Sequence, residues 1–209
     1  MPCRVTGIAF LDAQHGYMSG DCIAVSMDAG WSILETSDGG RTWVEMVLPE
    51  PSGVPPELKQ AKKTQGRICA PTGVKITPAG VLVQHDCLMT EGSSMQKNYF
   101  FLSLSADGGQ SWSGWQGETA GFVDSKLGYS LTGVQQDGTR MLSVTNDAGH
   151  IWQDVRQVSW PIAQMEFTPD GTGYVLASEW NPARQNYDFA LVSTSDGGDS
   201  WQLLEGNTR

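Results

Sequence analysis

Aspartates recur in one eight-residue pattern, and carboxylates at a repeated spacing are first candidates for acid–base chemistry. The pattern is [S/T]-x-D-x-G-x-x-W, and its four copies occupy residues 36–43, 105–112, 145–152 and 194–201. Hydrolysis of a glycosidic bond needs two carboxylates about 5–10 Å apart in one pocket. The sequence selects no such pair, neither among these aspartates nor elsewhere, for example Glu91 with Glu179.

A second pattern keeps nearly constant phase with the first, which favours a structural role for both. FLDAQHGY begins at Phe10, FVDSKLGY at Phe122 and FTPDGTGY at Phe167, and a degenerate copy, ITPAGVLV, begins at Ile76. Each begins 30–36 residues before the tryptophan of the aspartate pattern that follows it. Two independent patterns in step four times indicate an internal repeat.

Each residue type in the aspartate pattern suits a tight turn. An aspartate accepts backbone N–H groups of its own turn, and a glycine adopts a positive φ without strain. A tryptophan packs between neighbouring repeat units, where a large apolar ring contributes most. The predicted structural residues are therefore Asp38, Trp43, Asp107, Trp112, Asp147, Trp152, Asp196 and Trp201. Asp12 and Asp124 recur in the second pattern and are interpreted as turn residues too.

The spacing of the repeats predicts an all-β fold. The first unit reads as four short strands, at about 3–10, 17–25, 31–36 and 41–47. PPELKQAKK at 55–63 is the best helix candidate, with proline near its start. Units of four strands at 40–50 residues predict a small β-propeller of four four-stranded blades. We expect one domain over residues 1–209, with blades at about 3–48, 68–117, 118–157 and 158–206 and an insertion at 49–67.

The aspartate pattern resembles the Asp-box, or BNR, repeat of sialidase-type propellers. The paired words F-x-D-x-x-x-G-Y and S-x-D-G-G-x-T-W are most similar to the photosystem II assembly-factor branch. The resemblance implies that Asp-box C–D hairpins lie on the outer rim, away from the ligand face. The third copy departs from the pattern, with Ala148 for Gly and Ile151 for Ser or Thr.

A sialidase would need further residues that the sequence does not offer. The family carries an arginine cluster, whose first arginine sits in an Arg-Ile-Pro word, together with a Tyr/Glu pair and an acid. This chain has seven arginines, none in that context, and only GRICAP at 66–71. We therefore predict no catalytic residues and no enzyme. His85, Asp86 and Cys87 are metal-ligand types, but no second pair stands at zinc spacing, so neither a metal nor a cofactor is expected.

The four cysteines form two copies of one pair. Cys3 and Cys69 each lie seven residues before the start of the second pattern, and Cys22 and Cys87 follow that start by twelve and eleven residues. We predict disulfides Cys3–Cys22 and Cys69–Cys87, with four buried free thiols as the alternative. Disulfides favour a periplasmic or secreted protein whose signal peptide this sequence does not contain; free thiols would favour the cytoplasm.

Composition limits the partners. The net charge of −10 argues against nucleic acid and fits a basic protein partner. No apolar stretch reaches the length of a membrane span. The sequence leaves open whether four blades close a ring alone or the chain forms a homodimer.

Irregular loops on the face of the B–C and D–A connections are the expected binding surface. The predicted partner-binding residues are Lys59, Lys62, Met95, Lys97, Trp180 and Arg184. We predict a non-catalytic protein-binding propeller, either an assembly factor or an inhibitor of the immunity-protein type. The alternative is a carbohydrate-binding or sialidase-like protein that uses the tryptophans outside the aspartate pattern: Trp31, Trp115, Trp160 and Trp180.

Overall fold

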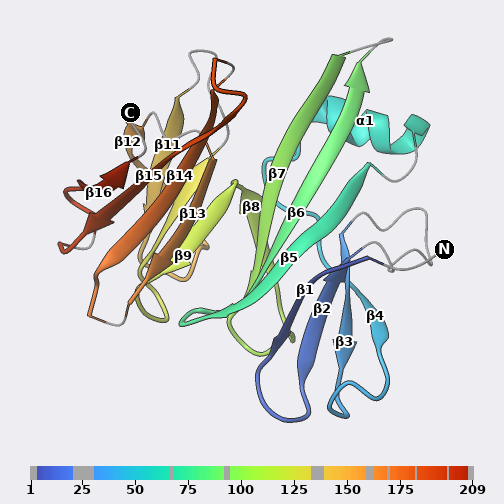
Figure 1. Ribbon diagram of the computed structural model, residues 1–209. Coiled ribbons are helices and arrows are strands. Elements are labelled where there is room, and N and C mark those ends of the chain that lie inside the picture. Colours follow the sequence, from blue (N-terminus) through green and yellow to red (C-terminus); the bar gives the residue numbers. More distant parts are fainter. Residues whose placement is uncertain are drawn as a thin grey trace. The chain divides into compact units, whose positions relative to one another are not determined.

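The described part of the chain is almost entirely antiparallel β-sheet (Figure 1). The computed structural model describes residues 4–20, 31–65, 68–91, 95–132, 139–158, 162–168, 170–181, 183–196 and 198–206. Two compact units, Met1–Gln116 and Gly117–Arg209, are described separately. Within the described residues, no helix is long and apolar enough to cross a membrane. The single-domain assignment and its blade boundaries stay predictions.

The first unit contains two four-stranded sheets and a helix. In both sheets the strands pair in chain order, and helix α1 lies between the sheets in sequence. Sheet 1 contains β1 (Val5–Phe10), β2 (Gly16–Gly20), β3 (Ser32–Thr36) and β4 (Val44–Val47). Helix α1 spans Pro56–Gln65, and sheet 2 contains β5 (Cys69–Thr77), β6 (Gly80–Glu91), β7 (Met95–Ser105) and β8 (Ser113–Gln116).

The second unit repeats this arrangement without a helix in its described residues. Sheet 3 contains β9 (Thr119–Phe122), β10 (Gly128–Thr132), β11 (Arg140–Thr145) and β12 (Gln153–Val158). Sheet 4 contains β13 (Ile162–Phe167), β14 (Gly173–Asn181), β15 (Asn186–Thr194) and β16 (Gln202–Gly206). The prediction of four four-stranded sheets is therefore confirmed. In each sheet the first and third turns lie at one end, because the strands run up and down in chain order.

Each copy of the aspartate pattern folds into the same hydrogen-bonded turn, which we call the aspartate turn. In the first copy, Thr36 Oγ1 donates to Asp38 Oδ1 at 2.9 Å and accepts the Gly40 amide at 2.9 Å. Asp38 Oδ1 also accepts the Thr42 amide at 2.9 Å, and Oδ2 accepts the Thr42 hydroxyl at 2.6 Å. Gly39 and Gly40 have φ of 73° and 85°, which a side chain would resist. The Asp38 carboxylate therefore serves the turn.

Hydrogen bonds also keep these aspartates ionised. Bonds from the side chain and backbone of Thr42 lower the pKa of Asp38 to about 2. The equivalent bonds from Ser111 lower the pKa of Asp107 to about 2. In the fourth turn Ser200 donates from its hydroxyl at 2.5 Å and its amide at 2.9 Å, and the pKa of Asp196 is lowered further. A carboxylate held in its charged form is poorly suited to donate a proton.

The third turn has one hydrogen bond fewer at its aspartate. Asp147 Oδ1 accepts the Thr145 hydroxyl at 2.7 Å and the Ile151 amide at 2.9 Å. Ile151 carries no hydroxyl, so it cannot supply the bond to Oδ2 that Thr42, Ser111 and Ser200 supply in the other turns. Ala148 adopts φ of 59°, a conformation that favours glycine. These are the two positions at which the sequence departs from the pattern.

The phenylalanine of the second pattern links the first strand of its sheet to the start of the fourth. Phe10 packs edge-on against Trp43 at 6.1 Å between ring centroids, and Phe167 packs against Trp201 in the same way at 6.3 Å. The phenylalanine ring also lies on the glycine of its own pattern, because a methyl group on Gly16 would meet the ring of Phe10. The F-x-D-x-x-x-G-Y pattern is thus a packing motif.

Each unit has its own apolar core. In the first unit Tyr17, Ile33, Val83 and Phe101 are buried together with Leu58 and Ala61 of helix α1. In the second unit the core contains Tyr129, Leu131, Leu142, Met165, Phe167, Val175 and Val192. These residues come from both sheets of the unit, so each pair of sheets packs face to face.

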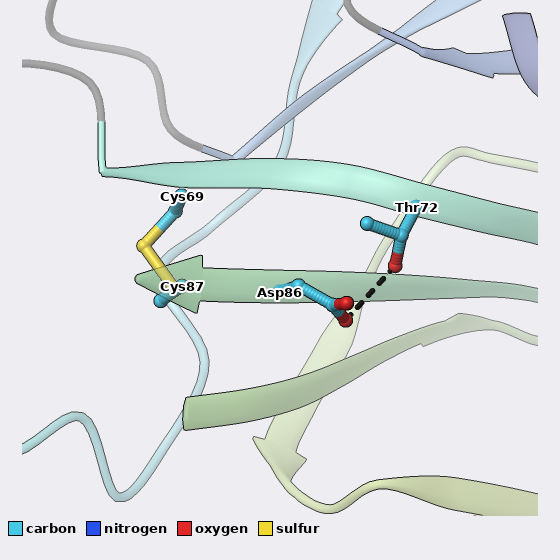
Figure 2. The surroundings of a disulfide bond; sticks show 4 residues. All are labelled: Cys69, Thr72, Asp86 and Cys87. Atoms are coloured by element: carbon cyan, nitrogen blue, oxygen red, sulfur yellow. Dashed lines mark hydrogen bonds between the residues drawn. A yellow bond between two sulfur atoms is a disulfide. The ribbon is translucent and has the colours of Figure 1, made fainter. Parts of the chain in front are cut away.

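One of the two predicted disulfides is confirmed. Cys69 and Cys87 stand opposite each other on β5 and β6 and are joined by a disulfide (Figure 2). Next to it, Thr72 Oγ1 donates to Asp86 Oδ1 at 2.9 Å. Cys3 and Cys22 lie outside the described residues, so their pairing stays a prediction.

Replacing Ile151 with Ser should stabilise the protein by about 0.5–1 kcal/mol, because the hydroxyl supplies the missing hydrogen bond to Asp147 Oδ2. The Ile151 side chain is 65% exposed, so little apolar burial is lost. Urea unfolding measures the change. As the matched control in the same unit, Ser200→Ala should cost a similar amount. Equal stability of Ile151→Ser and wild type would contradict the role assigned to this bond.

Replacing Cys69 and Cys87 with Ala should lower the free energy of unfolding by about 3 kcal/mol under oxidising conditions. The disulfide closes a loop with a sequence separation of 18, and the chain-entropy model gives this magnitude. Urea unfolding with and without reductant separates the contribution of the disulfide bond from that of the packing of the two sulfur atoms. With reductant, the difference between variant and wild type should shrink to the loss of sulfur packing. An unchanged difference would contradict the contribution of the bond.

Candidate functional site

The insertion between sheets 1 and 2 is fixed to the first unit by helix α1. The helix begins at Pro56, a residue favoured in the first turn. Leu58 and Ala61 are 0% and 5% exposed and join the core cluster that contains the disulfide cysteines. One side of the helix is therefore part of the core, and its charged residues are held at fixed positions.

Glu57 joins the helix to the β6–β7 hairpin. Its Oε1 accepts the Tyr99 hydroxyl at 3.0 Å and lies 3.5 Å from Lys97 Nζ. Lys97 Nζ also lies 5.0 Å from the centre of the Tyr99 ring, a cation–π contact. The backbone amide of Glu57, the Tyr99 hydroxyl and the Lys97 ammonium together lower the pKa of Glu57. The three side chains form one network.

Two of the lysines on helix α1 itself make similar contacts. Lys59 Nζ is 2.7 Å from Glu50 Oε1, in a pair whose side chains are 51% and 40% exposed. Lys62 Nζ lies 5.1 Å from the centre of the buried Trp31 ring. We call these residues the helix–hairpin surface: Glu50, Glu57, Lys59, Lys62, Lys97 and Tyr99.

Three of the six predicted partner-binding residues belong to the helix–hairpin surface as defined above. Lys59 and Lys62 come from the helix and Lys97 comes from β7. Met95 opens the same strand, but the structure does not describe its side chain. Trp180 and Arg184 belong to the second unit, where Arg184 pairs with Asp188 at 3.0 Å and the Trp180 side chain lies outside the described atoms. None of this tests binding, so the residues stay predictions.

Sequence reasoning missed the residues that hold the lysines in place. Glu50, Glu57 and Tyr99 are not among the residues singled out from the sequence. The sequence held one signal: Glu57 stands in the first helical turn, where a carboxylate is favoured. Nothing in the sequence indicated that it also contacts the hairpin.

The candidate metal ligands do not form a site. Cys87 is in the disulfide, and Asp86, its neighbour on β6, points to the other face of the strand and accepts a bond from Thr72. His85 is fully buried, with Nε2 3.3 Å from Ser103 Oγ and its ring edge-on to Trp31 at 5.2 Å. No group of three metal-ligating side chains occurs in the described part of the chain.

The described residues also bear on the carbohydrate alternative. Trp31 is 4% exposed and packs against His85 and Phe101, so its ring is not displayed for stacking on a sugar. A hollow of about 150 Å³ beside the third aspartate turn contains a single carboxylate in its lining, which comprises Val144, Asn146, Asp147, Ile151 and Gln153. One carboxylate is not the pair that glycoside hydrolysis requires.

The comparisons agree with a propeller. No family model and no curated protein matches the sequence. Among solved structures, a Trypanosoma rangeli sialidase in complex with a difluorinated sugar acid is 12% identical, with a TM-score of 0.50 over 97% of this chain. The chain is built of β-propeller blades. It spans 37% of that sialidase.

Two other solved structures match with lower TM-scores. YCF48 bound to D1 peptide is 16% identical, with a TM-score of 0.40 over 96% of this chain and 67% of YCF48. A xylan β-1,4-xylosidase from Bacillus halodurans is 12% identical, with a TM-score of 0.34 over 94% of this chain and 40% of the xylosidase. At these identities the similarity concerns the fold alone.

Stability should fall as the pH drops below 6.5, because burial lowers the pKa of His85 from 6.5 to about 3. The unfolded chain binds a proton near pH 6.5, whereas the folded chain does so only near pH 3. Stability is therefore lost across this window, by up to about 1.4 kcal/mol per pH unit.

His85→Met removes this titration and keeps a side chain of similar size in the core. Urea unfolding between pH 7 and 4.5 should show a steeper loss for wild type than for His85→Met. Other titrating groups, including Asp86, are common to both proteins and cancel in the difference. Parallel stability curves would refute the assignment.

Proposed function

We propose that the chain is a non-catalytic protein-binding propeller that binds its partner through the helix–hairpin surface. The observation that carries this proposal is the fixation of the insertion. Leu58 and Ala61 bury one side of helix α1 in the core, while Glu57 bonds to Tyr99 and pairs with Lys97. A long insertion with no binding role would have little reason to be held to a neighbouring hairpin by both packing and charge.

Fixed side chains favour binding because less conformational entropy is lost when the partner arrives. Lys59 and Lys97 are each about half exposed, so their ammonium groups remain accessible to a partner. The lysine stems add apolar contact area beneath their charges. Exposed ion pairs such as Lys59–Glu50 contribute little to stability, so exchanging such a pair for a contact with the partner costs little.

The net charge of −10 favours a partner with a basic surface, since long-range attraction speeds encounter. The buried disulfide Cys69–Cys87 supports an oxidising compartment, such as the periplasm or the outside of the cell. An assembly factor or an inhibitor of the immunity-protein type would fit this combination. The paired sequence patterns, which resemble those of photosystem II assembly factors, also support a binding role.

Two of the arginines that the structure describes also support a non-catalytic role. A sialidase binds its substrate carboxylate with clustered arginines. Arg140 is instead buried 2.6 Å from Glu118, and Arg184 pairs with Asp188 in a different hairpin. Both guanidinium groups are engaged within the protein.

Replacing Lys59 and Lys97 with Ala should weaken partner binding at least tenfold, because the cations and their stems leave the surface. The partner is first isolated from extract of the producing cells with wild-type protein, and its affinity for each variant is then measured. Lys126→Ala with Arg156→Ala is the matched control, since it removes two exposed cations from the second unit. Equal losses in both double variants would contradict the proposed site.

Enzyme assays test the alternative directly. Hydrolysis of a fluorogenic sialoside or xyloside by the purified chain would contradict the non-catalytic proposal. Binding on a glycan array without a protein partner would favour the carbohydrate class.

A further inference from the structure

The disulfide lies where three parts of the first unit meet. Cys69 is the first residue of β5 and stands opposite Cys87 of β6 (Figure 2). Helix α1 ends at Gln65, four residues before Cys69, so the bond holds the chain a short distance beyond the helix. On the other side of β6, Cys87 stands opposite Tyr99 of β7, whose hydroxyl donates to Glu57 of the helix. The bond therefore joins the exit of the helix to the strand pair that contacts its start.

Beyond the disulfide, sheet 2 narrows to two strands. Strand β5 begins at Cys69, opposite Cys87, and β8 pairs with residues 101–104 of β7. Residues 88–91 of β6 and 95–98 of β7 therefore pair as a two-stranded ladder that extends past β5 (Figure 1). We call these residues the hairpin arm. Because two strands alone are only marginally stable in water, the arm depends on its base and on what packs against it.

The hairpin arm carries part of the helix–hairpin surface. Lys97 lies in the arm, opposite Met89, and its Nζ is 3.5 Å from Glu57 Oε1. Met89 is 3% exposed and belongs to the same apolar cluster as both cysteines and Leu58 of the helix. Cys87 and Met89 are two residues apart on one strand, so they share a face of β6. Helix α1 therefore contacts the face of sheet 2 on which the disulfide lies.

A sheet opens most readily at the end of a strand, and the disulfide closes such an end. Just beyond the first ladder pair, the Leu88 amide donates to the Ile68 carbonyl at 2.8 Å. Backbone bonds at strand ends open at a lower free energy than those in the middle of a sheet. The disulfide suppresses this opening, because the two strands cannot separate at Cys69 and Cys87. Opening here would release the helix exit and the base of the hairpin arm together.

We propose that the Cys69–Cys87 disulfide is a redox-sensitive clamp on the helix–hairpin surface. In the oxidised chain the bond keeps helix α1 and the hairpin arm at the spacing that holds Glu57 against Tyr99 and Lys97. In the reduced chain the start of β5 separates from β6, and the helix and the arm lose this fixed spacing while the rest of the unit stays folded. The effect on binding rests on the proposed function, whereas the release of the helix and the arm is measured without a partner.

Reduction of the clamp requires a dithiol. One thiolate of the dithiol attacks a sulfur of the Cys69–Cys87 bond, which breaks and leaves a mixed disulfide. The second thiol of the dithiol then displaces the bound cysteine and closes the dithiol's own disulfide. Two electrons and two protons pass from the dithiol to the cysteines, which end as two thiols. Cys69 and Cys87 are 0% and 1% exposed, so the attack follows the opening of the strand end.

Amide hydrogen exchange tests the clamp on the full chain alone. Oxidised wild type is compared with wild type in excess of a small dithiol and with the double variant Cys69→Ala/Cys87→Ala. In both altered proteins the amides of helix α1 and of the hairpin arm should exchange about tenfold faster or more, because neither is held at the disulfide. Amides of β2 and β3, in the same unit, should change much less. The double variant measured with dithiol shows what the remaining cysteines, Cys3 and Cys22, contribute.

Val81→Ala is the matched control, because it opens a cavity at the other end of β6. Val81 is fully buried and stands opposite Ser105, far along the strand from Cys87. The cavity lowers the stability of the whole unit, so exchange should rise throughout the unit and not in the helix and the arm alone. Faster exchange confined to the helix and the arm therefore distinguishes a local clamp from a general loss of stability.

Partner affinity separates the clamp from the proposed function. The double variant should bind the isolated partner about tenfold more weakly, because the helix and the arm must be ordered again on binding. Faster exchange in the helix and the arm with unchanged affinity would support the clamp and contradict the proposed binding surface. Unchanged exchange in the reduced wild type and the double variant would overturn the clamp. A rise spread evenly over the unit, as in Val81→Ala, would overturn it too.

Discussion

The carboxylate that closes each aspartate turn is the constraint on which the rest of the structure depends. Two consecutive residues with positive φ leave backbone amides pointing into the turn, and these amides need an acceptor. Asp38 and its counterparts supply that acceptor, and the hydroxyl of the first residue of the turn supplies another. The turn then fixes where the third strand of each sheet ends and the fourth begins. Tryptophan follows at a set position, so its indole can pack on the phenylalanine of its own sheet.

The same geometry accounts for how sheets are joined into units. A glycine beneath the tryptophan leaves room for the tyrosine of the preceding sheet, and in the first unit the carbonyl beside it accepts the tyrosine hydroxyl. Local turn chemistry thus creates the contact surface for the neighbouring sheet. A larger residue in place of Gly109 would block Tyr17 as well as strain the turn. Packing between sheets is therefore coupled to the hydrogen bonds within a single hairpin.

Much of this could be predicted from the sequence because the determinants are short and repeated. Four sheets, the turns and the pair Cys69–Cys87 follow from residue types in constant phase. The helix–hairpin contact could not be predicted in this way, because Glu57 and Tyr99 meet across 42 residues and occur once. The environment of His85 could not be predicted either, because it depends on Trp31 and Ser103, which no repeat places beside it. A repeated sequence pattern predicts the structure that the blades share, but it does not predict contacts that occur in one blade alone.

That distinction bears on where function resides. Residues that recur in each sheet already make hydrogen bonds within the fold. The aspartates accept backbone amides of their own turns, and three of the tryptophans donate their indole N–H to a glycine carbonyl of the same turn. Binding to another molecule needs side chains that are not already engaged in the repeated turns. The insertion with helix α1 offers such a group in Lys59, and the neighbouring strand β7 offers Lys97; both are held by acidic partners yet half exposed. A repeated scaffold with one fixed, non-repeated addition is well suited to recognition, because the scaffold supplies the rigidity and the addition supplies the specificity.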